Sequence, residues 1–110
     1  MPSVEELVQE AARRHDRYVE FLRMSTMSAG VYVLPAGAKD RQSPHGEDEI
    51  YYVVRGRASF RRGSRQVPVA PGDVLFVPAR ESHRFVSVRE ELVLLVVFAP
   101  AEGTAPALPS

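Results

Sequence analysis

The chain has 110 residues, of which 45% are hydrophobic, with 14 basic and 14 acidic side chains and no cysteine. This length suits a single domain with one core, and zero net charge argues against a nucleic-acid-binding domain, which is usually basic. The lack of cysteine excludes disulfides, cysteine-ligated zinc and a thiol nucleophile. No apolar run reaches the ~20 residues of a membrane-spanning helix, and residues 1–6 show no signal-peptide pattern. We therefore expect a cytoplasmic protein with no membrane or nucleic-acid partner.

The N-terminal segment 3–23 is predicted to form one amphipathic α-helix. Ser3 and Glu6 have the spacing of a capping box, in which each residue satisfies a free backbone N–H at the start of a helix. Apolar residues recur every three or four positions as far as Leu22, and His15 lies on the same stripe. We therefore interpret His15 as a packing or interface residue, because such a stripe needs a partner surface.

From residue 24 onward the apolar runs are short and are separated by Gly and Pro. The expected strands cover residues 29–34, 38–44, 48–55, 57–62, 65–69, 73–77, 83–88 and 91–98. Many short strands at regular spacing predict an all-β sandwich or barrel over residues 24–99. Gly56 and Gly63 are each expected in a hairpin turn, because glycine tolerates positive φ. Residues 100–110 are expected to be a loosely ordered tail of the same domain, which spans residues 1–110.

The run from Ser43 to Glu49 contains side chains that can bind a metal. Residues two apart on a strand face the same side, so Ser43, His45, Glu47 and Glu49 share one face. His83 lies at the start of a later predicted strand. Two neutral imidazoles and one carboxylate suit a divalent metal with open coordination positions. Spacing alone leaves a second interpretation open, in which the histidines are metal-free, hydrogen-bonded interior residues.

Two segments of the chain resemble the two motifs of the cupin superfamily, as found in small single-domain bacterial cupins with a conserved barrel. The residues that match the first motif are Gly37, His45, Glu49 and Gly56, and those that match the second are Gly72, Pro78 and His83. The resemblance covers residues 28–99. It implies an all-β double-stranded β-helix, the jelly-roll or cupin barrel, here with an N-terminal α-helix.

The resemblance also implies a metal site with His45, Glu49 and His83 as ligands. The ion would be divalent Fe, Zn, Mn or Ni, since two histidines and a carboxylate accept several of these metals. Ser43 stands where the family has a further histidine, and a hydroxyl is a poor ligand beside imidazole. The nearest side chains that could supply an additional ligand are Gln42 and Glu47.

A second departure from the family pattern is Arg80, which stands where a glycine usually follows the motif proline. If the turn needs positive φ there, arginine costs about 1–2 kcal/mol. The alternative is a different turn type.

For function, the resemblance implies a metal-dependent enzyme on a small organic molecule held in the barrel. Dioxygenase-like oxidation is the leading form of this oxidoreductase hypothesis, and isomerase or lyase chemistry comes next. The candidate catalytic residues are Glu47 and Tyr51. A carboxylate near a metal can be tuned for acid–base work, and Tyr51 shares the strand face of Glu49, from which it is expected to line the cavity. A solvated carboxylate and a core tyrosine are the corresponding non-catalytic interpretations. The alternative function is a non-catalytic module that binds a small molecule or a metal, since one fold hosts many functions.

The expected assembly is a homodimer. The apolar stripe of the predicted N-terminal helix needs covering, and residues 92–98 are apolar on both faces of their predicted strand. We expect the helix or the terminal strands to pack on a second copy of the chain.

Overall fold

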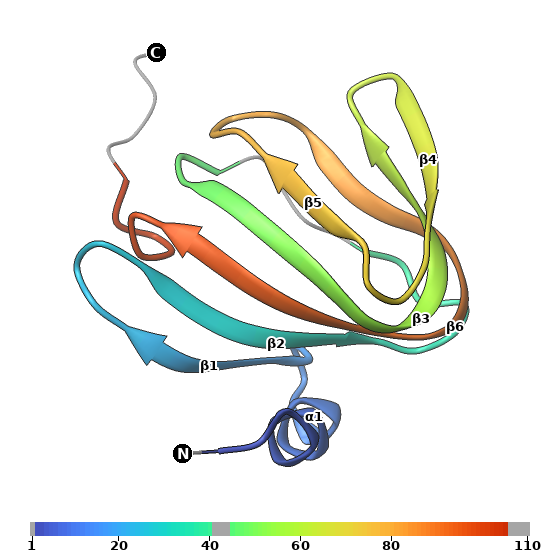
Figure 1. The fold of residues 1–110 in the computed structure, drawn as a ribbon, viewed down its shortest axis with the longest axis horizontal. Coiled ribbons are helices and arrows are strands. Elements are labelled where there is room, and N and C mark those ends of the chain that lie inside the picture. The colour runs from blue at the N-terminus through green and yellow to red at the C-terminus, as the bar shows by residue number, and fades with distance from the viewer. Residues whose placement is uncertain (1, 41–44, 106–110) are drawn as a thin grey trace.

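The computed structural model describes residues 2–40 and 45–105. In chain order the elements are α1 (Val4–Arg13), β1 (Tyr18–Arg23), β2 (Ser28–Leu34), β3 (Asp48–Arg62), β4 (Arg65–Val69), β5 (Val74–Val77) and β6 (His83–Ala99). All strand pairs are antiparallel in the order β1-β2-β6-β3-β4, and β5 pairs with β3. Figure 1 shows the strands curving around one another, with α1 packed beneath β1 and β2. The predicted all-β barrel with an N-terminal helix is confirmed.

The N-terminal helix is shorter than predicted. Ser3 and Glu6 form the expected capping box, but α1 ends at Arg13 and the chain becomes extended at Arg14. The segment predicted as its second half forms β1, which pairs with β2. Aromatic and β-branched residues in 18–23 favour a strand, and pairing with β2 outweighs a periodicity that also fits a helix. His15 lies in the turn after α1 and is exposed, so its expected packing role is wrong.

Strands β3 and β6 are longer than predicted, because each joins two of the expected strands. Gly56 does not form a hairpin turn but lies inside β3 at positive φ, where the register against β6 shifts. A Cβ at Gly56 would collide with the carbonyl oxygen of Glu91, so only glycine fits this close approach. Gly63 does form the expected turn, between β3 and β4. Of the strand expected at 38–44, residues 38–40 are not in a strand, and residues 41–44 lie outside the described part of the chain.

The apolar residues form two cores on opposite faces of β6. One face of β6 contributes Leu92, Leu94, Val96 and Phe98 to the barrel interior. On the other face, Val93 packs with Val31 and Val33 of β2 against the buried side of α1. The helix therefore covers the outer face of its own barrel, which accounts for the apolar stripe and for both apolar faces of residues 92–98. Among the described residues, no helix is long and apolar enough to cross a membrane.

Candidate metal centre and cavity

Three side chains predicted as ligands meet inside the barrel. His45, Glu49 and His83 place one nitrogen or oxygen each within 4.8 Å of one another. Oε1 of Glu49 lies 2.7 Å from Nε2 of His45 and 3.0 Å from Nε2 of His83. Glu49 and His83 are only 1% and 3% exposed. Because a buried carboxylate needs a compensating charge or hydrogen bonds, this cluster is a possible metal site.

The curvature of the barrel brings Glu49 and His83 together. Along the β3–β6 pair, Glu49 lies opposite Phe98 at one end, and His83 lies opposite Arg62 at the other. On a flat ribbon the two positions would be roughly 40 Å apart, at about 3.3 Å per residue. The register shifts around Gly56 bend both strands, so that opposite ends of the same ribbon meet.

Backbone carbonyl groups orient both histidine rings. Nδ1 of His45 lies 3.0 Å from the carbonyl oxygen of Glu47, and Nδ1 of His83 lies 3.0 Å from that of Glu81. A carbonyl oxygen only accepts hydrogen bonds, so each Nδ1 carries a proton and each Nε2 faces the cluster. This is the arrangement in which a neutral histidine presents Nε2 to a metal while Nδ1–H holds the ring in place.

The electrostatics of the cluster favour positive charge between the rings. A hydrogen bond with Glu49 is the main reason that the pKa of His45 is raised, against an opposing effect of burial. For Glu49 the largest single effect is burial, which raises its pKa, but hydrogen bonds from His45, His83 and Tyr51 outweigh it and the pKa is lowered. The cluster thus holds a carboxylate that needs a cation. A proton on His45 can meet that need, and a divalent metal fits the donor set of all three side chains.

The two candidate catalytic residues have different surroundings. The hydroxyl of Tyr51 lies 3.2 Å from Nε2 of His83, inside the barrel and next to the cluster. Glu47 is buried, but its Oε2 accepts a hydrogen bond from the backbone N–H of Ala105 at 3.0 Å, and it is not part of the three-residue cluster. Gln42, proposed as an additional ligand, and Ser43 lie outside the described residues.

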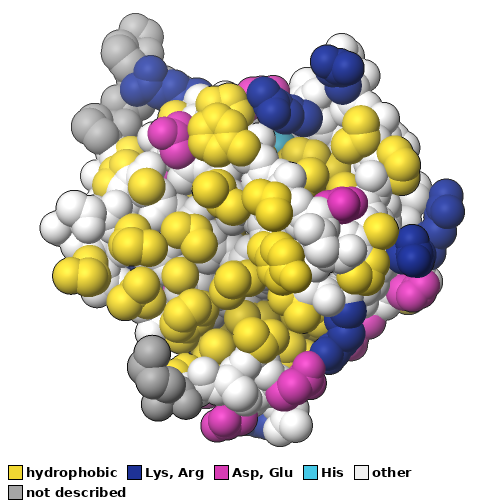
Figure 2. All heavy atoms as spheres, in the orientation of Figure 1, with side chains coloured by type: hydrophobic (Ala, Val, Ile, Leu, Met, Phe, Trp, Pro, Cys, Tyr) yellow, Lys and Arg dark blue, Asp and Glu magenta, His cyan; other side chains and the backbone are white. Residues whose placement is uncertain are grey.

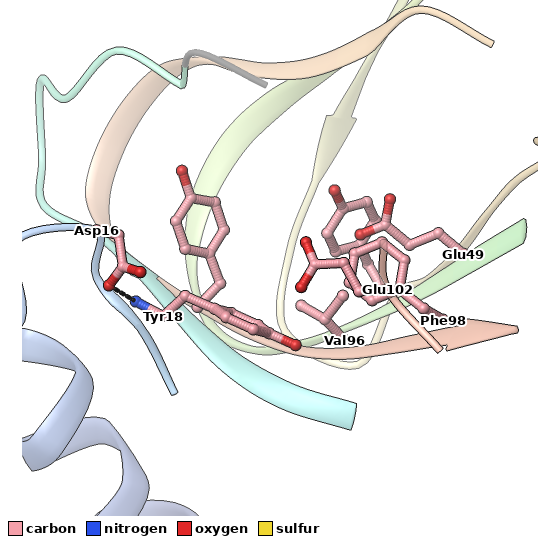
Figure 3. Close-up of a pocket in the computed structure, with 8 residues that line it drawn as sticks. Asp16, Tyr18, Glu49, Val96, Phe98 and Glu102 are labelled. Atoms are coloured by element: carbon pink, nitrogen blue, oxygen red, sulfur yellow. Dashed lines mark hydrogen bonds between the residues drawn. The ribbon is translucent and has the colours of Figure 1, made fainter. Parts of the chain in front are cut away.

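A cavity of about 270 Å³ extends from the cluster toward β1 and β2. Figure 3 shows Tyr18, Glu49 and Glu102 directed into the same space. The residues that line the cavity are Asp16, Tyr18, Tyr32, Glu49, Tyr51, Val96, Phe98 and Glu102. Sequence reasoning missed Asp16, Tyr18 and Glu102, because it placed the first two in a helix and the third in a loose tail. The alternation of Tyr18 and Glu20 with Val19 and Phe21 is the signal that could have indicated a strand.

The fold and the site together define the class of this protein. It is a small antiparallel barrel whose inner face has two histidines and a glutamate that form a possible metal centre. The chain belongs to the cupin family, since the family model Cupin_2, cupin domain, matches residues 30–98. This confirms the family resemblance inferred from the two motifs.

Three proteins of known sequence or structure are similar to this chain. An uncharacterised protein of Streptomyces coelicolor is 46% identical over 100 residues, which are 91% of this chain and 95% of that protein. An oxalate-binding protein of Thermotoga maritima is 41% identical over 51 residues, 46% of this chain and 42% of that protein. The crystal structure of the DMSP lyase DddQ from Ruegeria pomeroyi matches with a TM-score of 0.69 and 25% identity, covering 83% of this chain and 51% of the lyase. This chain thus spans about half the length of the lyase and less than half the length of the oxalate-binding protein.

Proposed function

We propose that this cupin is a metal-dependent enzyme that binds a divalent ion through His45, Glu49 and His83 and acts on a small organic molecule in the adjoining cavity. The observation that carries the proposal is the meeting of these three donors beside that cavity. Two histidines and one carboxylate leave coordination positions open, a pattern typical of non-haem iron oxygenases, so dioxygenase-like oxidation is the leading chemistry. When bound, the ion would supply Lewis acidity or, if it is iron, activation of oxygen.

The chain's own residues would prepare the substrate. Tyr51 lines the cavity with its hydroxyl 3.2 Å from Nε2 of His83, and the hydroxyl oxygen can accept a hydrogen bond from a donor group of the substrate. Phe98 and Val96 supply an apolar wall that excludes water from one side of the cavity. Glu47 can affect the reaction through its charge, while its carboxylate stays bonded to the backbone of Ala105.

Metal content is the first test. Untagged protein would be stripped, reconstituted separately with Fe²⁺, Mn²⁺, Ni²⁺ and Zn²⁺, and measured by elemental analysis. We expect about one ion per chain in the parent and in His15→Ala, the matched control with an exposed histidine away from the cluster. His45→Ala and His83→Ala should bind at least about tenfold more weakly, since even groups that only support metal ligands cost tenfold or more when removed. Substoichiometric metal in the parent with all four ions would refute the site.

The second test separates catalysis from binding. Oxygen uptake would be measured on the iron-loaded protein with catechols, flavonols, thiols and 1,3-diketones, with His83→Ala as the control. The alternative function, a non-catalytic binding module, is favoured by the name of the Thermotoga relative, and oxalate is therefore the first ligand to titrate. Tight binding of a ligand without turnover under any metal would support the module over the enzyme.

We also propose a homodimer that forms through an exposed apolar face on β3 and β5. Ile50 pairs with Phe76 and Tyr52 pairs with Val74, so the four side chains share one outer face, where they are 42% to 64% exposed. Figure 2 shows hydrophobic side chains gathered across the face of the molecule that lies over β3, β5 and β6. A contiguous apolar area of this kind marks an interaction site more often than free surface.

The dimer is tested by light scattering at micromolar concentration. Phe76→Asp should convert a dimer to a monomer while leaving metal content unchanged, because Phe76 lies on the outer face of the barrel. Met24→Asp, at an exposed apolar side chain outside this face, is the control that should stay dimeric. A parent protein that is monomeric under these conditions would refute the dimer.

A further inference from the structure

The cavity beside the candidate metal centre is lined by acidic side chains and by no lysine or arginine among the described residues. Its wall contains the carboxylates of Asp16, Glu49 and Glu102. Glu20 and Glu47 add to the negative potential, since both raise the pKa of Glu102, after the larger effects of burial and of Glu49. A cavity with this charge attracts cations and repels anions.

Arg23, a cation next to Glu102, is already engaged. The guanidinium of Arg23 lies 2.6 Å from the carboxylate of Glu20 and donates to the backbone carbonyl oxygen of Glu102 at 2.8 Å. It therefore offsets Glu20, and among the described residues the side chain of Glu102 forms no ion pair, although the charge of His45 lowers its pKa against the larger effects that raise it. A divalent ion on Glu49 would leave one positive charge at the cluster, and the two negative charges of Asp16 and Glu102 would outweigh it.

Aromatic rings complete the wall. Tyr18, Tyr32, Tyr51 and Phe98 line the cavity, and the rings of Tyr18 and Tyr32 meet edge to face with centroids 6.4 Å apart. The hydroxyl oxygen of Tyr18 is fully buried and has no hydrogen-bond partner within the described structure. An unpaired buried hydroxyl costs free energy that a bound ligand can recover by accepting or donating a hydrogen bond. Aromatic faces beside carboxylates are a setting in which organic cations bind.

We propose that the cavity takes a small organic cation, an amine or quaternary ammonium compound, with its charged group held between the Glu102 carboxylate and the ring of Tyr18. An oxygen on the same ligand would bind Tyr18 Oη or point toward His45, Glu49 and His83. Only this last contact rests on the proposed metal function. The inference predicts that a small dianion such as oxalate is a poor ligand outside the metal itself.

Choline and 3,3-dimethylbutan-1-ol are a matched pair of probes, since they share a shape and differ by the positive charge. Binding of each, and of oxalate, would be measured by ligand-observed NMR on metal-free and on zinc-loaded protein. We expect choline to bind at least about tenfold more tightly than its uncharged analogue in both forms, as for a desolvated cation over aromatic rings and a carboxylate. Equal binding of the two, including no detectable binding of either, would overturn the inference, as would tighter binding of oxalate to the metal-free form.

Variants connect the selectivity to the named residues. Glu102→Gln keeps the size of the side chain and should lower choline affinity about tenfold without changing that of the uncharged analogue. Asp16→Asn is a second variant, which keeps an oxygen that accepts from the Tyr18 backbone N–H. Glu90→Gln, at an exposed residue paired with Arg57, is the control that should change neither. Unchanged choline affinity in both Glu102→Gln and Asp16→Asn would overturn the assignment.

The two proposals can fail separately. If no metal binds but metal-free protein still prefers choline to its analogue, the metal function is refuted and the cation site stands. If metal binds stoichiometrically but the preference is absent, the cation site is refuted and the metal function stands.

Discussion

The backbone N–H of Arg80 donates a hydrogen bond to the backbone carbonyl oxygen of His45, with 2.6 Å between nitrogen and oxygen. Arg80 adopts a φ of 73°, the positive region that glycine tolerates best. The turn therefore does require positive φ at this position, and here a non-glycine residue adopts it. A strained residue that holds the backbone of a candidate ligand is typical of functional sites.

The strain at Arg80 predicts that Arg80→Gly stabilises the protein. Relief of the positive φ is worth about 1–2 kcal/mol, and the greater freedom of glycine in the unfolded chain cancels about 0.5–1 kcal/mol of it. We expect a net gain of up to about 1.5 kcal/mol in the free energy of unfolding, measured with urea. The reverse change, Gly72→Ala, is the control, since Gly72 has φ +95 in open space and should lose stability. A less stable Arg80→Gly variant would contradict the interpretation.

The cluster predicts opposite pH slopes for metal-free and metal-bound protein. The pKa of His45 in the folded protein lies above its ordinary value of 6.5, so the protonated pair with Glu49 stabilises the fold fully below about pH 6.5. That contribution is lost as the pH rises through the folded-state pKa. Metal binding needs neutral imidazole, so bound metal should stabilise the protein more as the pH rises.

Thermal melts between pH 6 and 9, with EDTA or with zinc, would measure both slopes. In EDTA, His45→Gln should flatten the pH dependence, whereas His15→Gln serves as the control and should leave it unchanged. Parallel slopes in EDTA and in zinc would contradict this account of the cluster.

The surroundings of Glu102 lead us to predict that its charge lowers the stability of the fold while it supports ligand binding. Burial, with the negative charges of Glu49, Glu20 and Glu47, raises its pKa above the ordinary value of 4.5. An acid with a raised folded-state pKa favours folding at low pH, and this contribution is lost as the pH rises through that pKa. At pH 7, Glu102→Gln should therefore raise the melting temperature of ligand-free protein. The gain should disappear below about pH 4.5, and a gain that is independent of pH would exclude charge as its cause.

The close contact between Gly30 and Tyr18 predicts that a larger side chain at position 30 would disturb the cavity wall. The ring of Tyr18 lies directly over Gly30, and a Cβ at this position would collide with Cζ and the hydroxyl of Tyr18. Gly30→Ala should therefore cost about 1–3 kcal/mol in the free energy of unfolding, as for other overpacked sites. The penalty should largely vanish in a Tyr18→Ala background, which a double-mutant cycle would measure. An equal penalty in both backgrounds would place the cost in the backbone.

The barrel and the three candidate ligands could be predicted because their signals are local. The spacing of Gly and Pro between short apolar runs indicates strands, and the two motifs contain His45, Glu49 and His83 in a recognisable order. Their meeting point depends on the bend around Gly56, which a sequence pattern does not distinguish from a hairpin turn. A glycine at positive φ serves a turn and a bulge equally well.

The cavity, in contrast, could not be predicted, because the signals that decide it are not local. Tyr18 and Leu22 are four residues apart, which fits a helical stripe, and Tyr18 and Glu20 are two apart, which fits a strand face. Only pairing with β2 decides between them, and that pairing is not local. Glu102 reaches the cavity because the backbone N–H of Glu102 donates to the side chain of Ser28, a contact between segments far apart in the chain.

The closure of the β3–β6 ribbon would give a metal bound at the candidate site a role in folding as well as in the proposed chemistry. An ion shared by Glu49 and His83 would tie two ends of one ribbon, as a disulfide ties two distant cysteines. This chain has no cysteine, so such an ion would be a reversible cross-link. Its strength would follow the free metal concentration, because a ligand that binds only the folded state stabilises it by mass action. The resistance of the barrel to opening would then depend on the metal supply around it.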